Sequence, residues 1–163
     1  MGAFLSLPIG PVPISLQTFF VFMAGLLLTP TEAFLTCFVY FLLGVVGLPI
    51  FAGGSGGPSS FFAPSFGFVL GFMLIAPIIS VLSRKIDLNN YVKSFSILLI
   101  AEVVLYALGL VYMYYMLKYL GTDLGTVTAV LQAGLIPFIP GDIAKMLIAV
   151  LIAPRIKKAI TQI

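Results

Sequence analysis

Long runs of apolar residues, interrupted only by proline, glycine or isolated charges, dominate this sequence. Hydrophobic residues occupy 61% of the 163 positions and charged residues only 8%, whereas a soluble domain carries about 25% charged residues. A chain with so few charges cannot cover a water-facing surface. The sequence therefore predicts an all-α integral membrane protein, because helices satisfy their own backbone hydrogen bonds inside a bilayer. Its length fits a single domain over residues 1–163.

The ends of the apolar runs predict where the chain crosses the membrane. We expect helical spans over residues 14–29, 32–48, 65–83, 91–118 and 140–160. The segment 121–140 is less apolar and is broken by prolines, which favours a short helix and a bend over a full crossing. Residues 2–10 (GAFLSLPIG) are typical of the last turns of a helix, so we expect a first helix of which most is missing.

The distribution of basic residues predicts the orientation of the chain in the membrane. Basic side chains are enriched on the cytoplasmic side, and one set of span ends holds six of the eight: Arg84, Lys85, Lys93, Arg155, Lys157 and Lys158. We therefore expect a multi-pass membrane protein with its C-terminus in the cytoplasm. The loops at residues 8–13 and 48–64, and the start of the last span, then lie on the external face.

Several classes of site are disfavoured by composition. The chain has no histidine, the commonest metal ligand and acid–base residue, so we expect no metal site and no catalytic residues. A net charge of +3 carried by scattered residues does not fit nucleic-acid binding. The single cysteine, Cys37, cannot form an internal disulfide.

Asp142 and Lys145 are the most informative charges, because charged groups within membrane spans are costly and usually functional. They lie one helical turn apart at the start of the last span, in the stretch PFIPGDIAKML. One interpretation is structural: Asp142 caps the helix while Lys145 pairs with it and extends toward water. The other is a binding site, in which an acceptor and a cation hold the two polar ends of a small ligand.

Two further polar residues within the spans have equally open roles. Glu102 lies near the middle of the 91–118 span, and Tyr106 follows one turn later on the same face. Glu102 could form a hydrogen bond between helices, contact a ligand, or orient another residue that does. Gln17 opens the 14–29 span and could bind a ligand, or tie the preceding loop to a neighbouring helix.

The glycine-rich stretch GGSGG at residues 53–57 predicts a loop that folds back on itself. It lacks the strand and the Lys-Ser/Thr of a phosphate-binding loop. Irregular backbone at membrane depth must line a cavity or be buried in protein. We therefore expect Gly54 and Ser55 to offer polar contacts to a ligand and Phe51 to form an apolar wall.

The motifs PIGPVPISLQTFF, GLPIFAGGSGG, GFVLGF and PFIPGDIAK, taken in order, resemble the BioY family over essentially the whole chain. The resemblance implies a six-helix substrate-binding (S) component of an energy-coupling factor (ECF) transporter, with its first helix truncated here. Such a component captures biotin outside the cell. It then works with a transmembrane coupling (T) protein and two ABC ATPases. The resemblance also implies that Asp142 accepts a hydrogen bond from the ureido ring of biotin, while Lys145 helps to hold its polar ends.

Two other function classes remain as alternatives from the residues alone. A small intramembrane enzyme could use Asp142, Lys145 and Glu102, although the sequence offers no nucleophile–base pair. A structural or channel subunit would use these charges only for packing. Neither alternative requires biotin.

Overall fold

The computed structural model describes residues 6–7, 14–121 and 127–161. Within these ranges the chain forms six α-helices, two short 3₁₀ segments and one two-stranded antiparallel sheet. The helices are α1 (Gln17–Leu27), α2 (Pro30–Val46), α3 (Phe66–Ser83), α4 (Tyr91–Tyr119), α5 (Val127–Gly134) and α6 (Ile139–Thr161). The shorter elements are β1 (Ser6–Leu7), β2 (Ile14–Ser15), η1 (Ala52–Gly54) and η2 (Pro58–Phe62).

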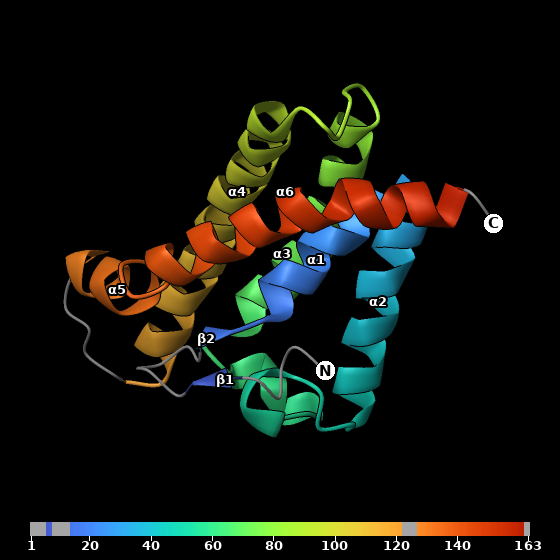
Figure 1. Cartoon of the computed structure of the whole chain (residues 1–163). Helices are drawn as coiled ribbons and strands as arrows, with labels where there is room; N and C mark the ends of the chain where they lie inside the picture. Colours follow the sequence, from blue (N-terminus) through green and yellow to red (C-terminus); the bar gives the residue numbers. More distant parts are fainter. Residues whose placement is uncertain (1–5, 8–13, 122–126, 162–163) are drawn as a thin grey trace.

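Helix α3 is the centre of the bundle and packs against α1, α2 and α4. Helix α6 crosses the bundle and packs against α1 and α4 (Figure 1). The sheet and the two 3₁₀ segments lie together at the end of the bundle where α2 finishes (Figure 1). The loop between α2 and α3 thus covers one end of the helices.

The predicted spans correspond to five of the six helices, and the largest difference is at the start of the chain. Helix α1 begins at Gln17, because residues 14–15 form strand β2. The expectation that residues 2–10 finish a helix is wrong for Ser6 and Leu7, which form β1 and pair with β2. Prolines at positions 8, 11 and 13 disfavour a continuous helix there. The rest of that segment lies outside the described residues.

The lengths of the helices fit a multi-pass membrane protein. Helices α3 and α4 are each long and apolar enough to cross a bilayer. Helices α5 and α6 are joined by a bend of 46° and together provide a third candidate span. Helices α1 and α2 are apolar but shorter, with 11 and 17 residues. The short helix and bend predicted before the last span are confirmed.

Each of the two helices that carry intramembrane charges has one buried face. On α6 this face has the spacing of a single helical stripe: Asp142, Lys145, Met146, Ala149, Val150 and Ala153. The stripe on α4 includes Leu98, Ala101, Glu102 and Leu105. The unusual charges therefore share a face with the apolar residues that pack the helices together, and packing directs them inward.

Candidate ligand-binding site

A cavity lies where α1, α3, α4 and α6 meet the loop between α2 and α3. The cavity has a volume of about 60 Å³. Its wall is rich in aromatic residues: Phe51, Phe66, Phe68, Phe72 and Phe138. Its polar lining is Ser15, Gln17, Thr18, Ser55, Ser60, Ser65, Glu102, Tyr106, Asp142 and Lys145. A mostly apolar wall with a few converging polar groups is typical of a small-molecule site.

Lys145 and Asp142 form an ion pair inside this cavity. The Nζ atom of Lys145 lies 2.8 Å from Oδ1 of Asp142 and donates a second hydrogen bond, 3.1 Å long, to Oγ1 of Thr18 on α1. The pairing considered in the structural interpretation is thus observed, but Lys145 is only 7% exposed and does not extend toward water. An ammonium group has three N–H donors, and these two bonds leave a third for an acceptor in the cavity.

Asp142 is held on its other side by α4. The hydroxyl of Tyr106 donates a hydrogen bond to Oδ2 of Asp142. The capping role considered for Asp142 is wrong, because α6 already begins at Ile139 and the backbone N–H of Asp142 bonds to the carbonyl of Phe138. The Asp142 side chain does not cap the helix and instead interacts with Tyr106 and Lys145. A chain of polar contacts thus links α4, α6 and α1.

Glu102 is the most unusual group in the cavity. Its side chain is buried, and neither carboxyl oxygen has a hydrogen-bond partner among the described residues. The structure therefore does not show the interhelical hydrogen bond that was one expectation for this residue. Asp142 and Lys145 lie close enough to interact with it electrostatically. A buried polar group without a partner is costly, which marks Glu102 as a group with unused bonding capacity facing the cavity.

Ser60 is a second polar group of this kind. It lies on η2, is 5% exposed, and its hydroxyl has no partner within the part of the chain that the structure describes. No local pattern separates Ser60 from Ser59 beside it, so Ser60 was not among the predicted site residues. Thr18 was also missed, although its position directly after Gln17 could have suggested it.

Gln17 lines the cavity but its amide is already engaged. It accepts a 2.8 Å hydrogen bond from Oγ of Ser15 and donates to the hydroxyl of Tyr40 on α2. Tyr40 in turn donates to the carbonyl of Ile50, 3.0 Å away. The interpretation of Gln17 as a tie between the loops and a neighbouring helix is therefore confirmed.

The residues of the α2–α3 loop contribute to the cavity in different ways. Phe51 is buried and forms part of the wall. Ser55 is exposed at the edge of the cavity, and its hydroxyl donates to the carbonyl of Ala52. Gly53 and Gly54 adopt φ angles of +75° and +72°, as expected for a tight glycine turn. Gly54 is not part of the cavity wall, so the structure brings together seven of the eight predicted residues.

These features define a class of protein: a multi-pass helical membrane protein with a mostly apolar cavity that contains a few charged and polar groups beneath a loop. The chain belongs to the BioY family, whose family model matches residues 1–162. The resemblance inferred from the sequence motifs is thereby confirmed.

Relatives and a solved structure agree with this assignment. The biotin transporter BioY of Thermotoga maritima is 36% identical over 162 residues, covering 97% of this chain and 88% of the relative. The probable biotin transporter BioY of Pyrococcus horikoshii is 38% identical over 158 residues, with 96% and 88% covered. The fold is similar to the crystal structure of the S-component for biotin from an ECF-type ABC transporter. That similarity has a TM-score of 0.81 at 29% identity, covering 94% of this chain and 80% of the other.

Proposed function

We propose that this chain, acting as a single transmembrane substrate-binding domain over residues 1–163, binds biotin as the S component of an ECF-type importer. The observation that carries the proposal is the buried Asp142–Lys145 pair, which faces a cavity where the side chains of Glu102 and Ser60 have no hydrogen-bond partner among the described residues. The names of the relatives and of the similar structure supply the ligand.

The chemistry of the cavity suits the two parts of biotin. Its ureido ring offers N–H donors and a carbonyl acceptor, and Asp142 and Lys145 offer an acceptor and a donor in turn. Glu102 and Tyr106 lie on the neighbouring helix and complete a polar patch. The phenylalanine-rich wall, including Phe51, provides apolar surface for the sulfur ring and the alkyl chain.

Transport requires further partners and a defined orientation. We propose a T protein and two ABC ATPases as the coupling module, with ATP hydrolysis driving release of biotin inside the cell. The protein would lie in a prokaryotic cell membrane with the loop at residues 48–64 outside and the C-terminus inside. The bias in basic residues supports that orientation.

The central test measures the affinity of the purified protein for labelled biotin. Asp142→Asn and Lys145→Met each remove one charge of the pair, and we expect either to weaken binding by at least about tenfold, or about 1.4 kcal/mol. The matched control is Lys118→Met, because Lys118 is exposed on α4 and should leave binding unchanged.

The double variant Asp142→Asn/Lys145→Met separates a binding role from a structural one. A single change leaves a buried charge without its partner, whereas the double change removes both and should recover thermal stability. We expect the double variant to be as stable as the wild type and still deficient in biotin binding. Recovery of binding together with stability would show that the pair only supports the fold.

The alternatives have less support. The named relatives are transporters, and the described residues contain no group of three or more metal-binding side chains. Recovery of chemically unchanged biotin from the protein would argue against an intramembrane enzyme. A rise in melting temperature with biotin would argue against a structural or channel subunit that binds no ligand.

A further inference from the structure

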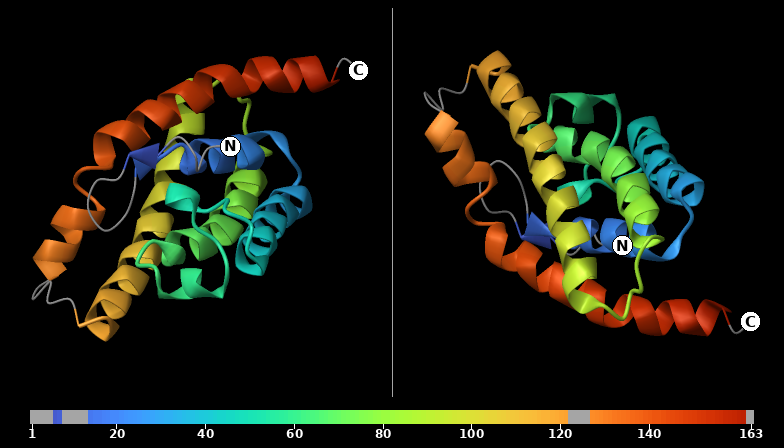
Figure 2. Two further views of the ribbon diagram at one scale, coloured as in Figure 1. Left: turned by 90° about the horizontal axis from the view of Figure 1, so that it is seen from below. Right: turned by 90° about the horizontal axis from the view of Figure 1, so that it is seen from above.

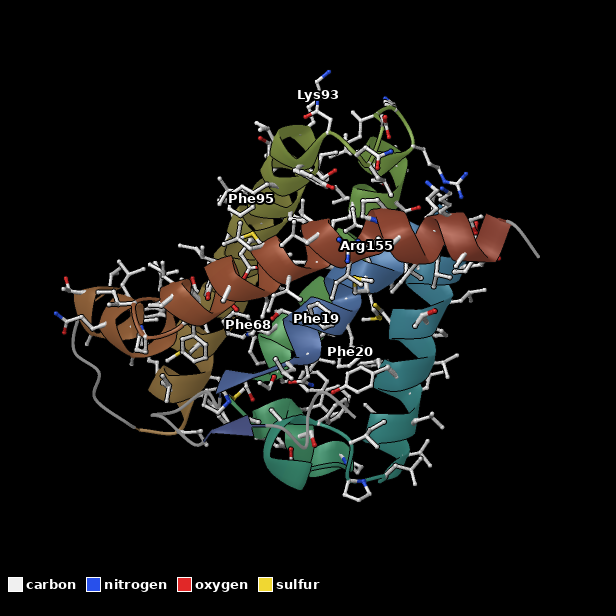
Figure 3. All side chains as sticks on the ribbon, viewed as in Figure 1. Phe19, Phe20, Phe68, Lys93, Phe95 and Arg155 are labelled. Atoms are coloured by element: carbon white, nitrogen blue, oxygen red, sulfur yellow. The ribbon has the colours of Figure 1, made fainter. Side chains whose placement is uncertain are left out.

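The α2–α3 loop reaches the cavity at two points. Phe51 lines the wall where the loop leaves α2, and Ser60 lines it where the loop approaches α3. Both side chains are buried, whereas residues 53–55 between them are exposed. The loop lies beside α4 in both views of Figure 2, and Phe68 of the cavity wall lies above the loop in Figure 3. The loop therefore shapes the wall through two short buried stretches separated by an exposed turn.

A tyrosine on α2 holds the first of these points. The hydroxyl of Tyr40 donates a 3.0 Å hydrogen bond to the carbonyl of Ile50, the residue directly before Phe51. The side-chain amide of Gln17 donates to the same hydroxyl, which leaves the hydroxyl hydrogen for the carbonyl. The ring of Tyr40 also packs edge-on against Phe51, with 5.5 Å between the ring centroids. One side chain thus fixes both the backbone and the ring at this point of the wall.

A tyrosine on α4 holds the second point in the same way. The hydroxyl of Tyr112 donates a hydrogen bond to the carbonyl of Phe61, the residue directly after Ser60. The centroid of its ring lies 6.1 Å from that of Phe66 in the cavity wall. Tyr112 packs closely on Gly67 of α3, where an added Cβ atom would come within 2.3 Å of the tyrosine Cβ. The close approach of α3 and α4 therefore determines where this tyrosine lies.

We propose that Tyr40 and Tyr112 are positioning residues of the ligand site. Their hydroxyls hold the loop so that Phe51 and Ser60 stay in the cavity wall, and this slows the release of the ligand. Neither tyrosine lines the cavity, so both act through the loop and not by contact with the ligand. A wall that is already in place spares the ligand the entropic cost of ordering the loop. The inference rests on the proposed function for the identity of the ligand.

Variants that replace tyrosine by phenylalanine remove only the hydroxyl groups. We expect Tyr40→Phe and Tyr112→Phe each to raise the dissociation rate of biotin about fivefold, the effect of about one net hydrogen bond, and the double variant to raise it about 25-fold. The association rate should change little, because the charged groups of the cavity are untouched. Release of labelled biotin from the purified proteins measures these rates. The matched control is Tyr115→Phe, because Tyr115 is 66% exposed on the same helix as Tyr112.

Hydrogen–deuterium exchange of the ligand-free protein separates this role from a general effect on folding. The backbone amide of Phe51 bonds to the carbonyl of Ser55, and that of Ser60 bonds to the carbonyl of Gly57, so these two amides report on the two held points. We expect each variant to speed exchange within residues 50–62 about fivefold. Amides of α3 and α4 should keep their wild-type rates, because the hydroxyls hold the loop and not the helices.

Three results would overturn the proposal. The first is unchanged exchange in the loop, which would mean that the hydroxyls do not hold it. The second is faster exchange throughout α3 and α4 as well, which would mean that they support the whole fold. The third is an unchanged rate of biotin release beside faster exchange in the loop. Because exchange is measured without ligand, it tests the hold on the loop even if the wild-type protein binds no biotin, a result that would contradict the proposed function itself.

Discussion

At the scale of single residues, the cavity combines satisfied and unsatisfied polar groups. Tyr106, Asp142, Lys145 and Thr18 form a continuous chain of contacts, while Glu102 has no hydrogen-bond partner among the described residues. A protein selected only for stability would not keep such a carboxyl group buried. The arrangement is explained if Glu102 gains its partner only when the ligand is bound.

Replacing Glu102 should therefore improve stability and harm binding. Glu102→Leu removes a buried polar group that has no hydrogen-bond partner in the described part of the chain, and we expect the ligand-free protein to become more stable by about 1–3 kcal/mol. The same change should weaken biotin binding by about tenfold or more. Thermal unfolding and binding titrations on one preparation measure both effects. The isosteric variant Glu102→Gln keeps a polar group and should show a smaller gain. A loss of stability in Glu102→Leu would mean that the carboxyl group supports the fold.

Sequence reasoning found the costly charges but not all of their surroundings. Asp142, Lys145 and Glu102 stand out because charge is rare in apolar spans, and their helical spacing fixes the face they share. Thr18 and Ser60 carry no such signal, since hydroxyl residues are common in loops and at the ends of helices. Their positions depend on how α1 and η2 fold over the cavity, which local spacing does not determine.

At the scale of elements, the contact between α2 and its following loop shapes the cavity wall. Gly44 lies on the buried face of α2, and the ring of Phe51 packs directly against it. A Cβ atom at position 44 would come within 2.1 Å of the ring. The glycine is thus required by close packing, and it lets the loop return over the helix that it has just left.

Substitution of Gly44 should disturb both the wall and the binding site. Alanine normally stabilises a helix by about 1 kcal/mol relative to glycine, but Gly44→Ala forces the Phe51 ring out of its place. We expect a net loss of about 1–3 kcal/mol from overpacking and weaker biotin binding. Thermal unfolding and titration with biotin measure these effects.

A second substitution tests the cause. Phe51→Leu removes the ring that blocks the new methyl group, so Gly44→Ala should cost less in a Phe51→Leu background. A double-mutant cycle gives the size of this coupling. Equal costs in the two backgrounds would show that the contact between these residues is not responsible.

The helices themselves were largely predictable, because apolar runs ended by proline, glycine or charge leave few other choices. The start of the chain was not, since the strand pairing of residues 6–7 with 14–15 depends on a contact across the intervening prolines. The helix cap at Thr29 and Glu32 also went unnoticed. There, the backbone of each residue donates a hydrogen bond to the side chain of the other, as in a capping box.

At the scale of the whole molecule, the distribution of basic residues distinguishes the two ends of the protein. The glycine-rich loop lies at one end of the molecule, and the end of α3, the start of α4 and the end of α6 lie away from it (Figure 1). The basic residues Arg84, Lys85, Lys93, Arg155, Lys157 and Lys158 belong to these three regions. Nothing in the helix packing alone decides which end faces the cytoplasm. The charge bias decides it in our proposal, and the orientation can be tested directly.

Labelling of introduced cysteines from one side of the membrane tests this orientation. The native Cys37 is buried and can be removed by Cys37→Ala. In that background we expect Ser55→Cys to react with an impermeant maleimide in intact cells, and Lys158→Cys to react only after permeabilisation. Both positions are exposed in the structure. The reverse pattern would place the cavity loop inside and contradict the proposed direction of capture.

Helix α6 joins the two ends of the molecule. Asp142 lines the cavity and Lys158 lies in the last turn of the helix, and their separation of 16 residues corresponds to about 24 Å. Pro154 lies between them inside α6, and a proline in a helix interior removes a backbone hydrogen bond and favours a kink. The cavity and the basic end are thus connected by one helix whose hydrogen bonding is interrupted between them.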